Sequence, residues 1–138
     1  MAYWLLKSEP ESWSWDAQKK KGAKGEPWSG VRNFTAAGNM KAMKKGDLGF
    51  FYHSGEEKAV VGIVEIIGEY RPDPTDETGR FGLVIVKAVE DVPKPVTLSA
   101  VKANPKLAEM SLVKFSRLSV QPVTAAEWKI VCTMGGMK

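Results

Sequence analysis

The sequence predicts a small α+β domain whose bent neighbouring strands form a closed or nearly closed β-barrel. Its 138 residues, 43% of them hydrophobic, suit one domain with one core. The β-branched stretch 58–70 carries glycines at positions 62 and 68, which are typical of bulges or of bends in a barrel. Strands and helices do not alternate regularly, which argues against a parallel doubly wound sheet. Bent neighbouring strands in one small domain favour a barrel instead.

Two strands and two helices are expected in the first part of the chain. The apolar run 2–7 ends at Ser8-Glu9-Pro10 and is typical of a strand that enters a turn. A helix is expected over 12–21, with Ser12 or Ser14 as its N-cap, followed by a loop over 24–27. Asn33 can cap a second helix that runs to about Lys45, because late lysines suit the negative end of a helix. A strand over 47–53 and a turn over 54–57 follow.

The second half begins with the β-branched strand and adds two strands and two helices. Residues 71–79 contain two prolines, two aspartates and no apolar residue, which predicts a surface loop. A strand over 81–89 is expected to end at Pro93 and Pro95, and a short helix over 97–103 to stop before Pro105. A final strand covers 118–123. The capping box from Thr124 to Glu127 starts a last helix, which Gly135-Gly136 end.

Composition excludes several classes of protein. The formal net charge of +4 and the pI of about 9.2 suit an anionic partner such as nucleic acid, without requiring one. Cys132 is the only cysteine, so we expect a reducing compartment and neither a disulfide framework nor a cysteine-rich zinc site. No apolar run reaches membrane-spanning length. Lys7 and Glu9 interrupt the apolar start, which argues against a signal peptide.

Five tryptophans are more than the packing of a chain of this size requires. Trp4 in the first strand and Trp128 on the last helix are expected in the core. Trp13 and Trp15 stand two residues apart at a helix start and cannot share one face. One of them should pack inward, while the other covers a surface or a pocket rim. Trp28 lies in a loop before Gly30, where lining a pocket and filling the core are equally compatible with the pattern.

Two segments predict a site for a flat, polar ligand such as a nucleobase. They are Trp28–Asn33 and Phe50–Gly55. Aromatic faces stack on planar ligands, while Arg and Asn side chains bind their hydrogen-bonding edges. Arg32 and Asn33 also stand at an expected helix start, where free backbone N–H groups bind oxygens. Asn33 is equally compatible with a simple N-cap.

Neither catalysis nor metal binding is expected. His53 is the only histidine and is compatible with a purely structural hydrogen-bonding role. A Ser-His pair with Ser54 is unfavourable, because neighbouring residues at a strand end point in opposite directions and no serine has a glycine-framed nucleophile elbow. One histidine and one cysteine cannot furnish the usual metal-ligand sets. No glycine loop of the phosphate-cradling type is present, so no cofactor is expected.

Basic side chains fall into three groups that can flank such a site. The groups are Lys19–Lys21 with Lys24, Lys41 with Lys44 and Lys45, and Lys102, Lys106 and Lys114 with Arg117. Each is compatible with a solvated face, and together they could hold a phosphate backbone. On a strand, Arg117, Ser119 and Gln121 would face one way, and Leu118 and Val120 would face the core.

Five ordered segments closely resemble those of the EVE domain family, and the resemblance covers the chain nearly from end to end. The segments are Lys7–Pro10, Trp28 with Gly30–Asn33, Phe51–Ser54, Pro72–Thr75, and Ser116–Val120 with Pro122. This resemblance implies one domain over residues 1–138 with a PUA-like fold, a small and mostly antiparallel β-barrel surrounded by helices. It also implies a relation to the YTH readers of methylated adenine.

The resemblance further implies non-enzymatic binding of modified bases, notably methylated or hydroxymethylated cytosine, in an aromatic-walled pocket. Trp28 would supply a stacking wall of that pocket. The implied ligand-binding residues are Lys7, Ser8, Trp28, Gly30, Val31, Arg32, Asn33, Tyr52, His53, Ser54, Arg117 and Ser119.

The expected partner is therefore DNA or RNA that carries modified bases, bound by a monomer without a cofactor or a membrane. We expect a cytoplasmic location for a bacterial form and a nuclear one for a eukaryotic form. Two alternatives stay open. One is a small-molecule sensor or protein-interaction module that uses the same pocket. The other, less favoured, is a base-processing enzyme or hydrolase that uses His53.

Overall fold

The computed structural model describes residues 1–137, which contain six strands together with α-helices and two short 3-10 helices. In chain order the elements are β1 (Tyr3–Ser8), α1 (Trp15–Lys20), η1 (Gly22–Lys24), β2 (Glu26–Trp28), α2 (Phe34–Ala42), β3 (Leu48–His53), β4 (Ala59–Pro72), β5 (Gly82–Thr97), α3 (Leu98–Ala103), η2 (Pro105–Leu107), α4 (Ser111–Lys114), β6 (Val120–Val123) and α5 (Ala125–Met134). None of the helices within 1–137 is long and apolar enough to cross a membrane.

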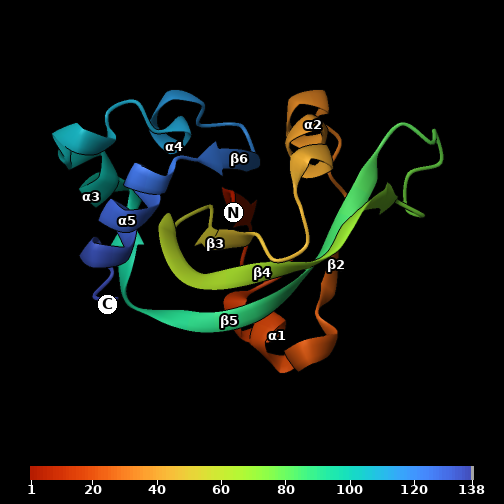
Figure 1. The fold of residues 1–138 in the computed structure, drawn as a ribbon, viewed down its shortest axis with the longest axis horizontal. Coiled ribbons are helices and arrows are strands. Elements are labelled where there is room, and N and C mark those ends of the chain that lie inside the picture. Colours follow the sequence, from red (N-terminus) through yellow and green to blue (C-terminus); the bar gives the residue numbers. More distant parts are fainter. Residues whose placement is uncertain (138) are drawn as a thin grey trace.

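The strands form one mixed sheet in the order β2-β5-β4-β3-β1-β6. β1 pairs with β3 in parallel, and the other four pairings are antiparallel. More than 35 residues separate β1 from β3, which is ample for the crossover that a parallel pair needs. Figure 1 shows β4 and β5 as long curved strands that run side by side, with α3, α4 and α5 gathered near one end.

The α+β class is confirmed, but a closed barrel is not. In the described residues β2 and β6 are the two edges of the hydrogen-bonded sheet, so the sheet is open. The two glycines expected to bend β4 do lie at irregular points, because the β4–β5 register shifts on the approach to Gly62 and on both sides of Gly68. Such irregularities curve a sheet without closing it.

The sheet carries a hydrophobic cluster on each face. On β1, Trp4 and Leu6 belong to one cluster, and Leu5 between them belongs to the other, as the two-residue period of a strand requires. The first cluster includes residues of α1 and α2, and the second includes residues of α3, α4 and α5. Trp4 and Trp128 are buried in the core, as predicted from the sequence.

Two segments of the sheet differ from the expectation. Residues 26–28 were expected in a loop, yet they pair with β5 as an edge strand, where a proline is tolerated. The strand expected to stop at Pro93 and Pro95 continues to Thr97. The ladder to β4 passes from Asp91 directly to Val96, so neither proline has to donate a hydrogen bond to β4.

The other elements match with shifted ends. Of the two N-cap candidates Ser14 is confirmed, because its side chain accepts a hydrogen bond from the Ala17 N–H, and α1 is therefore shorter than the expected 12–21. α2 ends at Ala42 and has the predicted Asn33 cap, and α5 has the predicted capping box at Thr124. The short helices η1, η2 and α4 were not predicted.

Candidate functional site

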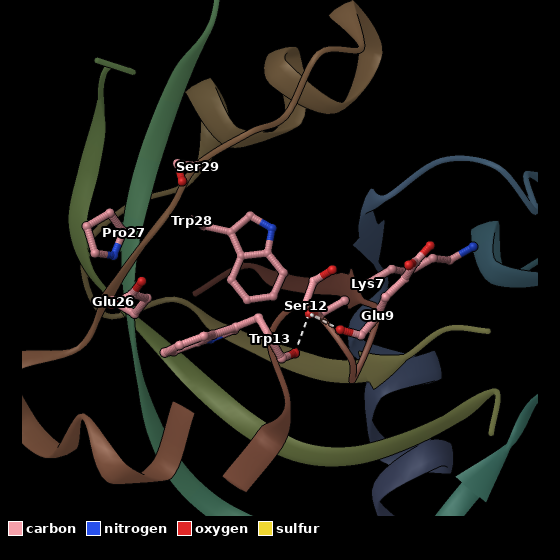
Figure 2. A pocket seen from close by; sticks show the side chains of 9 residues that line it. Lys7, Glu9, Ser12, Trp13, Glu26, Pro27, Trp28 and Ser29 are labelled. Carbon is pink, nitrogen blue, oxygen red and sulfur yellow. Dashed lines mark hydrogen bonds between the residues drawn. The ribbon is translucent and has the colours of Figure 1, made fainter. Parts of the chain in front are cut away.

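The tryptophan pocket, a hollow of about 380 Å³, lies where β1, the following turn and β2 meet. Its lining residues are Lys7, Ser8, Glu9, Ser12, Trp13, Glu26, Pro27, Trp28 and Ser29. Figure 2 shows the two indoles near its centre, with Lys7, Glu9 and Ser12 on one side and Glu26, Pro27 and Ser29 on the other. The pocket therefore has two aromatic walls and a polar rim.

Trp28 is the more deeply buried wall. It pairs with Val84 at the end of β2, and its ring meets Phe51 edge-on, with ring centroids 5.6 Å apart. Only 8% of the residue is exposed, so most of the indole is fixed by the core. Within residues 1–137 its indole N–H makes no hydrogen bond, unlike those of Trp4, Trp13 and Trp15.

Trp13 is the more exposed wall, and a tight turn positions it. The Trp13 backbone N–H donates to the carbonyl of Glu9 at 2.9 Å, and the Ser8 hydroxyl donates to the Trp13 carbonyl. The indole N–H donates to Oε1 of the buried Gln18 at 2.8 Å, and Nε2 of Gln18 donates to the Val86 carbonyl. The orientation of Trp13 is therefore tied to the central strand β5.

The expectation for the Trp13–Trp15 pair is met by this arrangement. Trp15 is 5% exposed and packs in the first hydrophobic cluster, whereas Trp13 lines the pocket. The two-residue spacing predicted that one tryptophan would pack in the core and the other would face outward. It did not predict which tryptophan would take which position.

His53 lies outside the tryptophan pocket and is hydrogen-bonded within the protein. Its Nε2 accepts a hydrogen bond from the backbone N–H of Trp15 at 2.9 Å, so Nδ1 carries the proton and donates to the Glu57 carboxylate at 2.6 Å. Both ring nitrogens are thus engaged. His53 and Trp28 approach the same Phe51 ring edge-on, which places them near each other but not in one pocket.

Tyr52 is buried and does not line the tryptophan pocket. It belongs to the second hydrophobic cluster, and burial raises the pKa of its phenol. Lys7 Nζ lies 5.7 Å from the centre of the Tyr52 ring. Tyr52 thus contacts the side chain of Lys7, its partner residue on β1.

Gly30 and Arg32 are held by a buried carboxylate. Asp73 accepts hydrogen bonds from the Gly30 N–H at 2.8 Å and from Arg32 Nη1 at 3.2 Å. Arg32 Nη2 donates to the Thr75 hydroxyl, and Thr75 donates twice to Asp73. Burial alone would raise the pKa of Asp73, but hydrogen bonds from Thr75, Gly30 and Arg32 lower it to about 2. This network anchors the segment after Trp28, so Arg32 serves the loop rather than the pocket. Val31, between them, is buried in the first cluster.

A second hollow, the Arg117 groove, lies between the start of α2 and the segment after α4. Its volume is about 410 Å³. Its lining residues are Asn33, Thr35, Phe115, Ser116, Arg117 and Leu118. Asn33 uses its carbonyl oxygen to cap α2 by accepting from the Ala36 N–H, which confirms the N-cap alternative and leaves its NH₂ group for another partner.

A third hollow, the acidic hollow, takes in Ser54. Its volume is about 350 Å³, and it shares Glu9 with the tryptophan pocket. Its lining residues are Glu9, Pro10, Glu11, Ser54, Gly55, Glu56 and Glu57. Ser54 therefore lies outside the tryptophan pocket, and its N–H donates a hydrogen bond to the carbonyl of Ser8, which lines that pocket.

The residues expected in one site are consequently distributed over neighbouring positions. Lys7, Ser8 and Trp28 line the tryptophan pocket, while Asn33 and Arg117 line the Arg117 groove. The carbonyl of Ser119 accepts the backbone N–H of Lys7, so Ser119 acts through its main chain. Gln121, expected on the polar face of the last strand, is fully buried, and its Nε2 donates to the Phe115 and Leu118 carbonyls.

Sequence reasoning missed several lining residues. These are Glu9, Ser12, Glu26, Pro27 and Ser29. Three of them flank Trp28 in sequence, and the other two flank the turn that carries Trp13. The edge strand β2 brings these two stretches together, and that strand was expected to be a loop.

Comparison with known proteins identifies the family. The model of the EVE domain matches residues 2–134. Thymocyte nuclear protein 1 of Gallus gallus is 33% identical over 96% of this chain and 68% of the relative. A crystal structure of an Agrobacterium tumefaciens protein is 57% identical, with a TM-score of 0.97 over 99% of this chain and 94% of that one.

Two further solved structures were determined with nucleic acid. The human THYN1 protein in complex with 5-methylcytosine-containing DNA is 29% identical, with a TM-score of 0.93 over 100% of this chain and 99% of that one. The YTH domain of Zygosaccharomyces rouxii MRB1, in complex with N6-methyladenosine RNA, has a TM-score of 0.60 at 18% identity over 99% of this chain and 85% of that one, so it shares the fold alone. The fold shared with this YTH domain agrees with the relation expected from the sequence. On the family match and the full-length similarity to its members, the chain belongs to the EVE domain family.

Proposed function

We propose that the chain binds a modified base, of the methylated or hydroxymethylated cytosine class, in DNA or RNA, and that it does so without catalysis. The observation that carries this proposal is the tryptophan pocket, in which two indoles enclose a hollow of about 380 Å³. That volume falls in the range of about 300–1,000 Å³ that is usual for small-ligand sites. The human THYN1 structure, with its 5-methylcytosine DNA, supports the choice of ligand.

The chemistry of the walls suits a cytosine. Indole faces stack on any base, and such stacking contributes about 1–3 kcal/mol per base in single-strand binders. Glu9 and Glu26 line the pocket, and a carboxylate can accept a hydrogen bond from the exocyclic amino group of cytosine. The unpartnered indole N–H of Trp28 can donate to a base carbonyl. A base in a duplex must leave the helical stack to reach this pocket, so single-stranded or mismatched sites should bind more tightly than paired ones.

The engaged state of His53 supports binding without turnover. A general base needs a ring nitrogen within reach of the substrate proton, and both nitrogens of this ring already hold partners. Conversion of a modified nucleoside by the purified protein, lost in His53→Ala, would overturn this part of the proposal.

A small-molecule sensor is the second candidate, and the two carboxylates at the pocket favour it. Glu9 lies at the rim and would repel a nearby phosphate, whereas a free modified nucleoside carries none. Salt dependence separates the two functions, because binding that neutralises phosphates weakens steeply as salt rises.

Binding of short oligonucleotides tests the proposal. Oligonucleotides with cytosine, 5-methylcytosine or 5-hydroxymethylcytosine would be titrated, single- and double-stranded, at several salt concentrations. We expect a preference for one modified form that is strongly reduced in Trp13→Ala, with circular dichroism to show that the variant is folded. Equal affinity for all three bases would contradict the modified-base function. Tight binding of the free nucleoside, insensitive to salt, would favour the sensor.

A further inference from the structure

The Arg117 groove adjoins the tryptophan pocket along two borders. Ser29 lines the pocket and Asn33 lines the groove, and the four-residue span between them reaches at most about 14 Å. On the other border, Lys7 lines the pocket and its Nζ donates to the Ser116 carbonyl at 2.7 Å, and Ser116 lines the groove. The two hollows are therefore neighbouring compartments.

The acidic hollow and the Arg117 groove both adjoin the tryptophan pocket, and they differ in charge. Toward the acidic hollow lie four carboxylates, those of Glu9, Glu11, Glu56 and Glu57. Toward the Arg117 groove lie Lys7 and the exposed Arg117, and the six residues that line this groove include no carboxylate. A polyanionic strand that enters the pocket is repelled in the first direction and attracted in the second.

The groove also presents an aromatic surface on a fixed backbone. Phe115 is 56% exposed, so one face of its ring is open to a ligand. The turn that carries it is held from below, because Gln121 Nε2 donates to the Phe115 carbonyl at 3.2 Å and to the Leu118 carbonyl at 2.9 Å. The Leu118 N–H closes the same turn onto Phe115. An exposed ring on a rigid turn can stack on a base at little cost in conformational entropy.

We infer that the Arg117 groove binds the nucleotide next to the modified base, with Phe115 stacked on its base and Arg117 beside its phosphate. Asn33 lines the same groove, and its NH₂ group can donate a hydrogen bond to this nucleotide. This inference rests on the proposed function and adds to it a second subsite and a direction for the bound strand. The ligand is accordingly a single-stranded segment of at least two nucleotides that runs from the tryptophan pocket across Lys7.

A thermodynamic cycle tests the contact between Phe115 and the neighbouring base. Parent protein and Phe115→Ala would be titrated with single-stranded DNA that carries one modified cytosine, and with the same DNA lacking the base on its 5′ or its 3′ side. We expect Phe115→Ala to lower the affinity for intact DNA about 5- to 150-fold. Removing the neighbouring base on one side should lower the DNA affinity of the parent by a similar factor and leave the affinity of Phe115→Ala unchanged. The reason is that loss of the base and loss of the ring each delete the same contact.

Arg117→Gln and two controls complete the experiment. Arg117→Gln should weaken binding to all sequences alike and reduce the slope of log affinity against log salt by about one. Val89→Ala on β5 and Lys129→Gln on α5 remove an exposed apolar and an exposed basic side chain that line neither hollow, and should leave affinity unchanged.

The outcomes separate this inference from the proposed function. If Phe115→Ala binds like Val89→Ala, or if loss of the base on either side weakens both proteins equally, the second subsite is wrong while the base preference of the parent still stands. If the parent prefers no modified base, the proposed function fails and this inference fails with it.

Discussion

His53 Nε2 accepts the backbone N–H of Trp15 at 2.9 Å, and this bond fixes the start of α1 against the end of β3. The N–H at this helix start is buried and has no partner within the helix. Through this hydrogen bond, His53 helps to fix the segment that places Trp13 at the pocket. His53 therefore helps to position this segment and does not itself line the tryptophan pocket.

Replacing His53 should affect both stability and binding. His53→Ala leaves the buried Trp15 N–H without an acceptor, which should lower the free energy of unfolding by about 1–3 kcal/mol. It should also weaken modified-base binding, because the turn before α1 loosens. His53→Gln can restore an acceptor and should recover part of both. Denaturant titrations together with oligonucleotide binding check this, and an alanine variant equal to the parent in both would refute the positioning role.

Asp73 should make stability depend on pH in the acid range. Its pKa is lowered from 3.8 to about 2 in the folded protein. The stabilisation of the fold by ionised Asp73 is therefore complete above about pH 4 and is lost as the pH falls toward 2. Asp73→Asn should lower stability at pH 7 by about 1.5–3 kcal/mol, because charge-assisted bonds to Gly30, Arg32 and Thr75 are lost.

The free energies of unfolding of the parent and Asp73→Asn would be measured by denaturation from pH 7 to pH 2. Their difference isolates the effect of this carboxylate from that of other acids that titrate in the same range. This difference in free energy should become smaller as the pH falls. A difference that stays constant down to pH 2 would show that the charge of Asp73 contributes nothing.

Gly62 should not tolerate a side chain, whereas Gly38 should. A Cβ on Gly62 would lie 2.2 Å from the Trp15 indole, and moving that ring would break its hydrogen bond to Asp91. Gly62→Ala should therefore destabilise the protein by about 1–3 kcal/mol through overpacking. Gly38 lies within α2 with open space around it, so Gly38→Ala should stabilise by about 0.5–1 kcal/mol. Thermal unfolding of both variants checks the pair, and equal effects would contradict the packing argument.

Local patterns predicted those elements whose ends are marked by local chemistry. The caps at Asn33 and Thr124 were recognised because a cap depends on a few consecutive residues. The continuation of β5 through Pro93 and Pro95 was not predicted, since it depends on how β4 pairs with β5 across a long register. The parallel β1–β3 pair and the open sheet are properties of tertiary topology, which no local pattern encodes.

The same limit applies to the site. The local pattern left Trp28 open between a pocket wall and the core, and the family resemblance implied a wall; in the structure it lines the pocket and is also largely buried in the first cluster. Arg32 and Tyr52 were expected beside it, but Asp73 holds the first and the core contains the second. The residues near Arg32 in the sequence do not indicate that its partner is Asp73, which lies 41 residues away. Sequence reasoning therefore found the segments that build the site better than the side chains that face it.

Gln18 is predicted to control the orientation of Trp13 and hence the pocket. Its side chain is fully buried and joins the Trp13 indole N–H to the backbone of β5. In Gln18→Met both bonds are lost at nearly constant volume. We expect a loss of about 1–3 kcal/mol in stability, because the Val86 carbonyl and the indole N–H lose their partner. We also expect weaker binding of modified oligonucleotides, because the indole no longer has a fixed orientation.

Gln18→Glu distinguishes the two bonds of Gln18. An ionised glutamate keeps the acceptor for Trp13 but loses the donor to Val86 and buries a charge, so it should reduce stability more than the methionine variant does. If the variant folds, the retained acceptor should keep its binding closer to that of the parent. Protein stability and oligonucleotide affinity should therefore rank the two variants in opposite orders. Identical ranking by both measurements would mean that Gln18 supports the fold alone and that Trp13 is positioned by the turn before it.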